Sequence, residues 1–179
     1  MSLGYLVIFG IFALLSSLVS KRLKAKFKKY SQVRLSNGLS GKEIAERMLA
    51  AHGIVNVKIT QVAGSLTDHY NPVNRTVNLS ESVYFGKNAA SAAVSAHECG
   101  NAVQHATAYS MLSLRSKLVP IQNISGRILN IVIFFGGFLG VGMNSGVLGL
   151  TIIVACYAVL TLFSLVTLPV EFDASKRAL

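Results

Sequence analysis

The sequence is poor in charged residues, and those it has are unevenly distributed. Asp, Glu, Lys and Arg make up 13% of its 179 residues, whereas soluble domains contain about 25%. None of the four occurs in residues 1–20 or in residues 128–170. Hydrophobic residues reach 52%. This block pattern argues against a wholly soluble protein and predicts a mainly helical membrane protein with one polar domain.

Cysteine is scarce as well. Cys99 lies in the polar part of the chain and Cys156 lies in an apolar run, so we expect no disulfide between them. The chain has a net charge of +10, but it contains no nucleic-acid-binding motif and no basic strand interleaved with aromatic residues. We therefore expect no nucleic-acid partner, despite the net positive charge.

Three apolar runs occupy residues 3–20, 128–143 and 147–168. A membrane-spanning helix requires roughly 20 apolar residues, with about 17 as the usual minimum. The first run is followed at once by "KRLKAKFKK", which is the reverse of the order in a signal peptide. It therefore predicts an uncleaved anchor, with a signal peptide as the alternative. The other two runs flank the short turn "NSG" and predict a helical hairpin, which makes about three transmembrane helices.

A three-span arrangement places all 17 Lys and Arg residues on one side of the bilayer. The positive-inside rule makes that side the cytoplasm and leaves the N-terminus outside. We expect a multi-pass protein of the bacterial inner membrane with its polar domain facing the cytoplasm. The predicted domains are an anchor with its basic segment, a polar domain, a helical hairpin and a C-terminal helix start, at 1–29, 30–127, 128–168 and 169–179.

The polar domain begins with a predicted helix in residues 40–53. Ser40 can cap this helix, Glu43 can complete a capping box, and Gly53 can end it. Residues 55–63 alternate apolar and polar side chains, which is typical of a strand. A turn-rich segment follows that strand.

The second half of the polar domain begins with "TVNLS", residues 76–80, which predicts a short returning strand. An exposed edge on that strand could bind a peptide by strand addition, and an edge covered by the domain itself is the alternative. A helix is then expected from about Asn88, as its cap, to about Ala106. Small residues in "AASAAVSA" would let this helix pack closely on a neighbour.

That last helix contains "SAHECGNAVQH", residues 95–105. An HExxH helix places two histidines one turn apart, where both rings reach one zinc ion and the Glu activates a bound water. Here the second position is Asn101. His105 lies eight residues after His97, about 12 Å along a helix, so those two rings cannot share an ion. Taken alone the motif is a weak signal, and an ordinary structural helix remains the alternative.

A metal site of this kind needs a third ligand. The only carboxylates after the helix are Glu171 and Asp173. Pro169 suits the start of a helix, so we expect Glu171 in a first helical turn at the membrane surface. The helix dipole stabilises a carboxylate in that position, which is a structural explanation of the same residue.

Several segments together resemble the bacterial membrane neutral zinc metallopeptidases (zinc peptidase type 2). They are in the order of that family and cover most of the chain: "KFKKYSQV", "LTDHYNPVNRTVNLSESVY", "AAVSAHECGNAVQHA", "LRSKLVPIQNI" and "LVTLPVEFDASKRAL". The resemblance implies a small α+β, zincin-like catalytic domain and a zinc-dependent endopeptidase that acts on polypeptides. It also implies that relatives continue beyond Leu179.

The resemblance assigns roles to individual residues. It implies Zn²⁺ held by His97, by position 101 and by Glu171, with Glu98 as the catalytic base. It also favours a catalytic role for His69 near the metal, with a turn histidine bonded to the backbone as the alternative. A homo-oligomer is possible, since glycines in the apolar runs permit close helix contacts.

The sequence departs from this pattern at position 101, where the family motif HExGHAxQH has histidine. A neutral amide is a poor zinc ligand beside imidazole, so we expect little or no peptidase activity. An engineered inactivation and a native loss of activity would both produce Asn101. A non-catalytic pseudoprotease or membrane scaffold that binds polypeptides is the alternative function.

Overall fold

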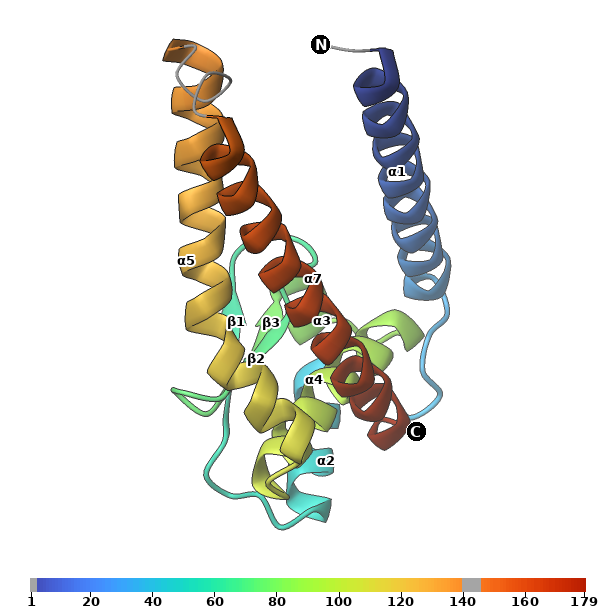
Figure 1. The fold of residues 1–179 in the computed structure, drawn as a ribbon. Helices are drawn as coiled ribbons and strands as arrows, with labels where there is room; N and C mark the ends of the chain where they lie inside the picture. Colours follow the sequence, from blue (N-terminus) through green and yellow to red (C-terminus); the bar gives the residue numbers. More distant parts are fainter. Residues whose placement is uncertain (1–2, 140–145) are drawn as a thin grey trace. The chain divides into compact units, whose positions relative to one another are not determined.

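The computed structural model describes residues 3–139 and 146–179 of the chain, and its elements are mostly helices (Figure 1). The chain forms two compact units, Met1–Cys99 and Gly100–Leu179. The helices are α1 Leu3–Ser31, α2 Gly41–Ala51, α3 Glu81–Tyr84, α4 Ala89–Ala106, α5 Ser110–Leu139 and α7 Gly146–Arg177; the strands are β1 Lys58–Val62, β2 His69–Asn71 and β3 Thr76–Ser80. The boundary between the units falls within α4. The four predicted domain limits remain predictions.

Helix α2 begins with the predicted capping box. The Ser40 side-chain oxygen accepts a hydrogen bond from the backbone N–H of Glu43, and the Glu43 carboxylate accepts one from the backbone N–H of Ser40 at 2.8 Å. These hydrogen bonds stabilise the ionised carboxylate and so lower the pKa of Glu43. After the helix, Gly53 adopts a φ of 67°, which glycine tolerates without a steric penalty. Both predicted ends of this helix are confirmed.

The sheet has three strands in the order β1-β3-β2. Strand β3 covers the predicted residues 76–80, and β1 lies inside the predicted range 55–63. Strand β2 was not predicted, because turn-forming residues surround its three positions. It pairs antiparallel with β3, whereas β1 pairs parallel with β3. The chain therefore reverses through β2, and the prediction of 76–80 as a strand returning from the first was wrong.

The central position of β3 also corrects the strand-addition hypothesis. Both edges of β3 are hydrogen-bonded to neighbouring strands, so residues 76–80 offer no free edge to a peptide. Val77 and Leu79 are fully buried. On the opposite face Asn78 accepts a hydrogen bond from Thr60 at 2.7 Å. Strand β3 is thus the core of the sheet.

Helix α4 begins at Ala89, and Asn88 caps it as predicted. The side-chain oxygen of Asn88 accepts hydrogen bonds from the backbone N–H of Ser91 at 3.0 Å and from its hydroxyl at 3.1 Å. Ser91 and Ser95 are fully buried. A side chain at Gly41, at the start of α2, would overlap the Ser95 hydroxyl and the Val83 carbonyl. The small residues of α4 therefore allow close packing on α2 and α3 within the first unit.

The second unit is built on α5 and α7, which lie side by side and antiparallel (Figure 1). The Arg115 guanidinium lies 5.9 Å from the centre of the Phe163 ring, which is a cation–π contact between the two helices. Most of the predicted turn at 144–146 lies outside the described residues.

The prediction of about three transmembrane helices was wrong. Among the described residues, one helical stretch, Gly149–Arg177 of α7, is long and apolar enough to cross a membrane. The apolar run 3–20 is at the lower limit of length and continues directly into basic residues. In α5, the apolar residues begin after Arg127, and the described part of that helix, to Leu139, is not among the candidate spans. The multi-pass arrangement and the external N-terminus lose their basis.

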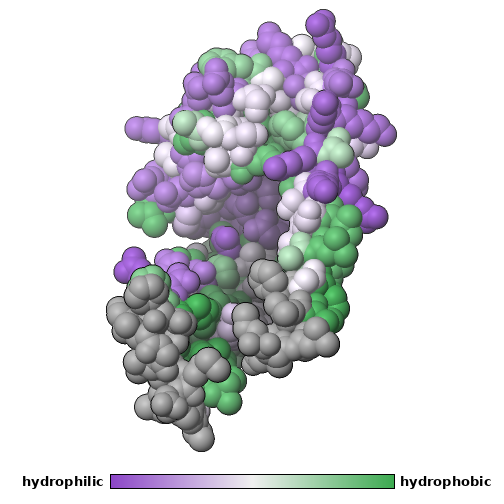
Figure 2. All heavy atoms as spheres, turned by 90° about the horizontal axis from the view of Figure 1, so that it is seen from above, coloured by the Kyte–Doolittle hydropathy of each residue, from purple (hydrophilic) through white to green (hydrophobic). Residues whose placement is uncertain are grey.

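Figure 2 shows patches of hydrophobic residues beside hydrophilic ones on the surface. Large apolar side chains remain exposed on α1, α5 and α7, for example Phe12 at 66%, Phe134 at 64% and Leu150 at 62%. Exposed apolar surface on this scale is typical of chains that contact a membrane or another protein.

The capping box gives a direct test of helix α2. Substituting Ser40→Ala removes the acceptor for the Glu43 N–H and should destabilise the protein by about 1 kcal/mol. Thermal unfolding of the purified chain in detergent measures the loss. Ser36→Ala, in the exposed segment before the helix, is the matched control and should leave the midpoint unchanged. Equal midpoints for the two variants would contradict the assigned cap.

Candidate functional site

Helix α4 carries the residues of the predicted zinc motif. Because α4 is one continuous helix from Ala89 to Ala106, His97 and position 101 lie one turn apart on the same face. Glu98 is buried, with 9% of its surface exposed, while His97 is half-buried. His105 is exposed in the last turn of the helix.

Cys99 anchors this part of α4 in the first unit. Its side chain is fully buried and its thiol lies 3.7 Å from the backbone carbonyl of Ala45. Burial, with a smaller contribution from the Glu98 carboxylate, raises the pKa of Cys99 to about 12. The thiol is therefore protonated near neutral pH, which makes it a poor nucleophile.

In the second unit, the end of α4 packs directly against the end of α7. A Cβ at position 100 would overlap the backbone carbonyl of Ala174. One turn later Gln104 is fully buried, and its side-chain amide donates hydrogen bonds to the Val170 carbonyl and to the Asp173 carboxylate, each at 2.8 Å. Arg177 donates to the same carboxylate. These contacts fix residues 170–177 against residues 100–107.

Glu171 lies within the segment that these contacts hold, but not in the first turn of a helix. Helix α7 runs from Gly146 to Arg177 and passes through Pro169, so the predicted helix start at Pro169 was wrong. Proline removes one backbone donor and usually bends or ends a helix. Here the contacts of Gln104 with residues 170 and 173 hold the helix together beyond the proline. The N-terminal dipole explanation of Glu171 no longer applies.

The predicted ligand set contains two strong zinc donors, His97 and Glu171, and one weak donor, Asn101. Within residues 3–139 and 146–179, no three His, Cys, Asp or Glu side chains gather where they could hold a metal ion. An amide stands at the i+4 position of the motif, and an amide oxygen is a weak donor for zinc. His97, Asn101 and Glu171 as ligands, and Glu98 as base, remain predictions.

His69 begins strand β2, whereas it was expected in a loop. Its side chain is exposed, and its Nδ1 atom lies 2.8 Å from the Thr67 carbonyl within the same segment. This is the backbone-bonded arrangement that the alternative interpretation describes. A catalytic role for His69 stays a prediction.

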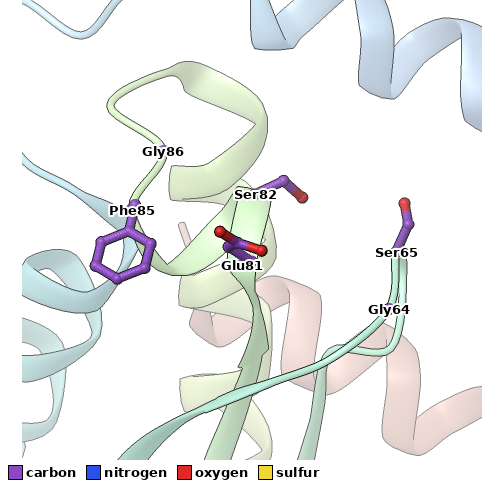
Figure 3. Close-up of a pocket in the computed structure, with 6 residues that line it drawn as sticks. All are labelled: Gly64, Ser65, Glu81, Ser82, Phe85 and Gly86. Atoms are coloured by element: carbon purple, nitrogen blue, oxygen red, sulfur yellow. The ribbon is translucent and has the colours of Figure 1, made fainter.

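The first unit also contains an open hollow of about 560 Å³ (Figure 3). It lies between the loop after β1 and helix α3, and it is lined by Gly64, Ser65, Glu81, Ser82, Phe85 and Gly86. Glu81 supplies its carboxylate and the Phe85 ring lies at its edge. Neither His97 nor Glu98 lines the hollow, so it is separate from the motif.

Gln104 was not singled out from the sequence. The role of Asp173 as the acceptor of its hydrogen bond was not predicted either. A polar residue in a helix rarely becomes fully buried without a partner. The spacing of Gly100 and Gln104, one turn apart, is the signal that could have revealed a close helix contact. The partner of that contact is 66 residues further along the chain, and periodicity gives no information at that distance.

The contact at Gly100 can be tested by adding one methyl group. Gly100→Ala should destabilise the second unit by about 1–3 kcal/mol, because the added Cβ overlaps the Ala174 carbonyl. Gly126→Ala in α5 meets no atom within 4 Å and should stabilise by up to about 1 kcal/mol. Unfolding midpoints in detergent measure both variants. A neutral or stabilising Gly100→Ala would disprove the close approach.

The burial of Cys99 predicts slow alkylation. A pKa of about 12 in place of 9.0 lowers the thiolate fraction about a thousandfold at pH 8. In a Cys156→Ser background, iodoacetamide should therefore modify the folded chain far more slowly than the urea-unfolded chain. The thiol ionises more readily after unfolding. Its contribution to the free energy of unfolding should therefore decline as pH rises from about 9 to about 12. Equal folded and unfolded rates would contradict the assigned burial.

Comparison with known proteins identifies the family. The family described as "Putative neutral zinc metallopeptidase" matches residues 5–179. A protein of Bacillus subtilis (strain 168) named "Putative membrane protease YugP" is 43% identical over 157 residues, which cover 88% of this chain and 68% of that protein. No solved structure matches the chain. Over nearly its whole length, the chain belongs to the family of neutral zinc metallopeptidases.

Proposed function

We propose that this chain is a membrane-bound member of the peptidase family whose hydrolytic activity is impaired by Asn101. The single observation that carries the proposal is the order of residues on α4. His97 and Glu98 are followed one turn later by an amide, on a helix that holds the motif in a regular geometry. The family match over residues 5–179 supports peptide hydrolysis as the ancestral reaction.

The remaining ligand set explains the expected impairment. One imidazole and one carboxylate, from His97 and Glu171, provide two strong donors, and catalytic zinc sites use three protein ligands. The Asn101 oxygen carries no charge and competes poorly with water for zinc. We therefore assign no hydrolytic step to the chain as it stands. When a zinc ion is bound in a site of this kind, it polarises a carbonyl and activates water.

The place of action in this proposal is the bacterial plasma membrane. The apolar stretch Gly149–Arg177 and the membrane protease among the relatives support it. The Lys and Arg residues are excluded from 128–170, and under the positive-inside rule this favours a cytoplasmic location for the basic parts of the chain. Polypeptides are the proposed substrates.

Restoring histidine tests the proposal. Asn101→His should raise bound zinc from well below stoichiometric to about one ion per chain, and it should restore cleavage of a casein or membrane-protein substrate. Zinc content is measured by elemental analysis after gel filtration, so the metal readout does not depend on activity. A restored chain that binds no zinc would overturn the proposal.

Two further variants in the Asn101→His background separate the assigned roles. Glu98→Gln should keep the zinc and abolish cleavage, because it removes a base without removing a ligand. Glu171→Gln should lower the zinc content, because it removes a charged donor. If the restored chain binds zinc but cleaves nothing, and Glu98→Gln changes nothing, the pseudoprotease alternative replaces the enzyme.

A further inference from the structure

Helix α1 carries a segment of concentrated positive charge that the proposed function does not use. Between residues 21 and 29 six side chains are basic and all six are exposed: Lys21, Arg22, Lys24, Lys26, Lys28 and Lys29. They point to several sides of the helix, since they occupy most positions of two and a half turns. The first acidic residue of the whole chain is Glu43. We call residues 21–29 the basic segment.

The turns immediately before the basic segment are apolar and exposed. Leu14, Leu15, Leu18 and Val19 each expose between 47% and 66% of their surface. They belong to the same continuous helix as the basic segment. Exposed apolar side chains in this number indicate an apolar partner. A surface that binds α1 must therefore be apolar beside one part of the helix and negatively charged beside the next.

We propose that the basic segment binds the anionic headgroups of a phospholipid bilayer, while the preceding turns contact the acyl chains. A bilayer offers both requirements in the same order, hydrocarbon and then charged headgroups. The segment is about 12 Å long, close to the screening length of about 8–10 Å at physiological salt. Each basic residue near such a surface strengthens binding about fivefold. A nucleic acid would match the charge but not the apolar turns.

The full chain reconstituted in phosphatidylcholine bilayers tests this proposal. Spin-labelled phosphatidylglycerol and spin-labelled phosphatidylcholine are compared for their association with the protein by electron paramagnetic resonance. We expect a several-fold preference for phosphatidylglycerol, which decreases towards one in about 1 M NaCl because salt screens the headgroup charge. A preference near one at low salt would overturn the proposal, and so would one that salt leaves unchanged.

Two triple variants with the same change in net charge locate the effect. Lys24→Gln, Lys26→Gln and Lys28→Gln together remove half of the charge of the basic segment and should lower the preference clearly, and Gln keeps a good helix propensity. Arg47→Gln, Lys58→Gln and Lys87→Gln remove three exposed charges elsewhere in the first unit and should leave the preference intact. An equal decrease in the control variant would overturn the assignment to the basic segment.

This proposal rests on the membrane location and not on catalysis. Co-flotation with phosphatidylcholine vesicles reports the location by itself. A chain that fails to float contradicts the proposed location and the lipid proposal together. A chain that floats but shows no preference between the two lipids contradicts the lipid proposal alone. The zinc content and peptide cleavage of the Asn101→His chain are separate measurements, and neither outcome of the lipid experiments changes what they test.

Discussion

The arrangement of the second unit depends on a position that has no side chain. Gly100 lets the backbone of α4 approach the Ala174 carbonyl of α7 more closely than any other residue permits. The close approach brings Gln104 into a fully buried position, where its amide donates to the Val170 carbonyl and the Asp173 carboxylate. The two hydrogen bonds of the buried amide nitrogen can both form only in one helix register. The segment that contains Glu171 is therefore held in a single arrangement beyond Pro169.

In the proposed account, the packing of the helices and the chemistry of the motif are separate matters. The fold keeps a regular, capped helix that presents His97 and Glu98, and it keeps α7 continuous through Glu171. Position 101 carries a neutral amide, whereas an HExxH motif has an imidazole there. A protein can retain the packing of an enzyme while losing affinity for its metal, because the packing contacts at Gly100 and Gln104 involve none of the proposed ligands.

Local signals in the sequence predicted local structure well. The capping residues Ser40 and Asn88 fixed the starts of α2 and α4, because a side-chain oxygen there satisfies backbone donors that a helix leaves open. Strand β1 followed from its alternating pattern; β3 was predicted as a strand, but its central position in the sheet was not. The three residues of β2 are too few for any periodicity to appear. Pro169 predicted a helix start, and long-range contacts with Gln104 overrode that preference.

The membrane arrangement was the least predictable part, since hydropathy measures the length of an apolar run and not its structural context. The first run passes into the basic segment and the second belongs to a helix that already carries Arg115 and Arg127. The placement of His97, Glu98 and Asn101 on one helix was predictable, because their spacing on it follows from helical geometry alone. The packing that holds Glu171 was not, because it joins residues 66 positions apart.

The affinity of the unmodified chain for zinc tests the central claim most directly. Competitive titration against a chromophoric chelator measures this affinity without any substrate. With an amide at position 101, we expect a dissociation constant weaker than about 1 µM, which corresponds to about 8 kcal/mol. A nanomolar dissociation constant that disappears in the His97→Ala variant would show that Asn101 is an adequate ligand, and the account of an impaired peptidase would be wrong.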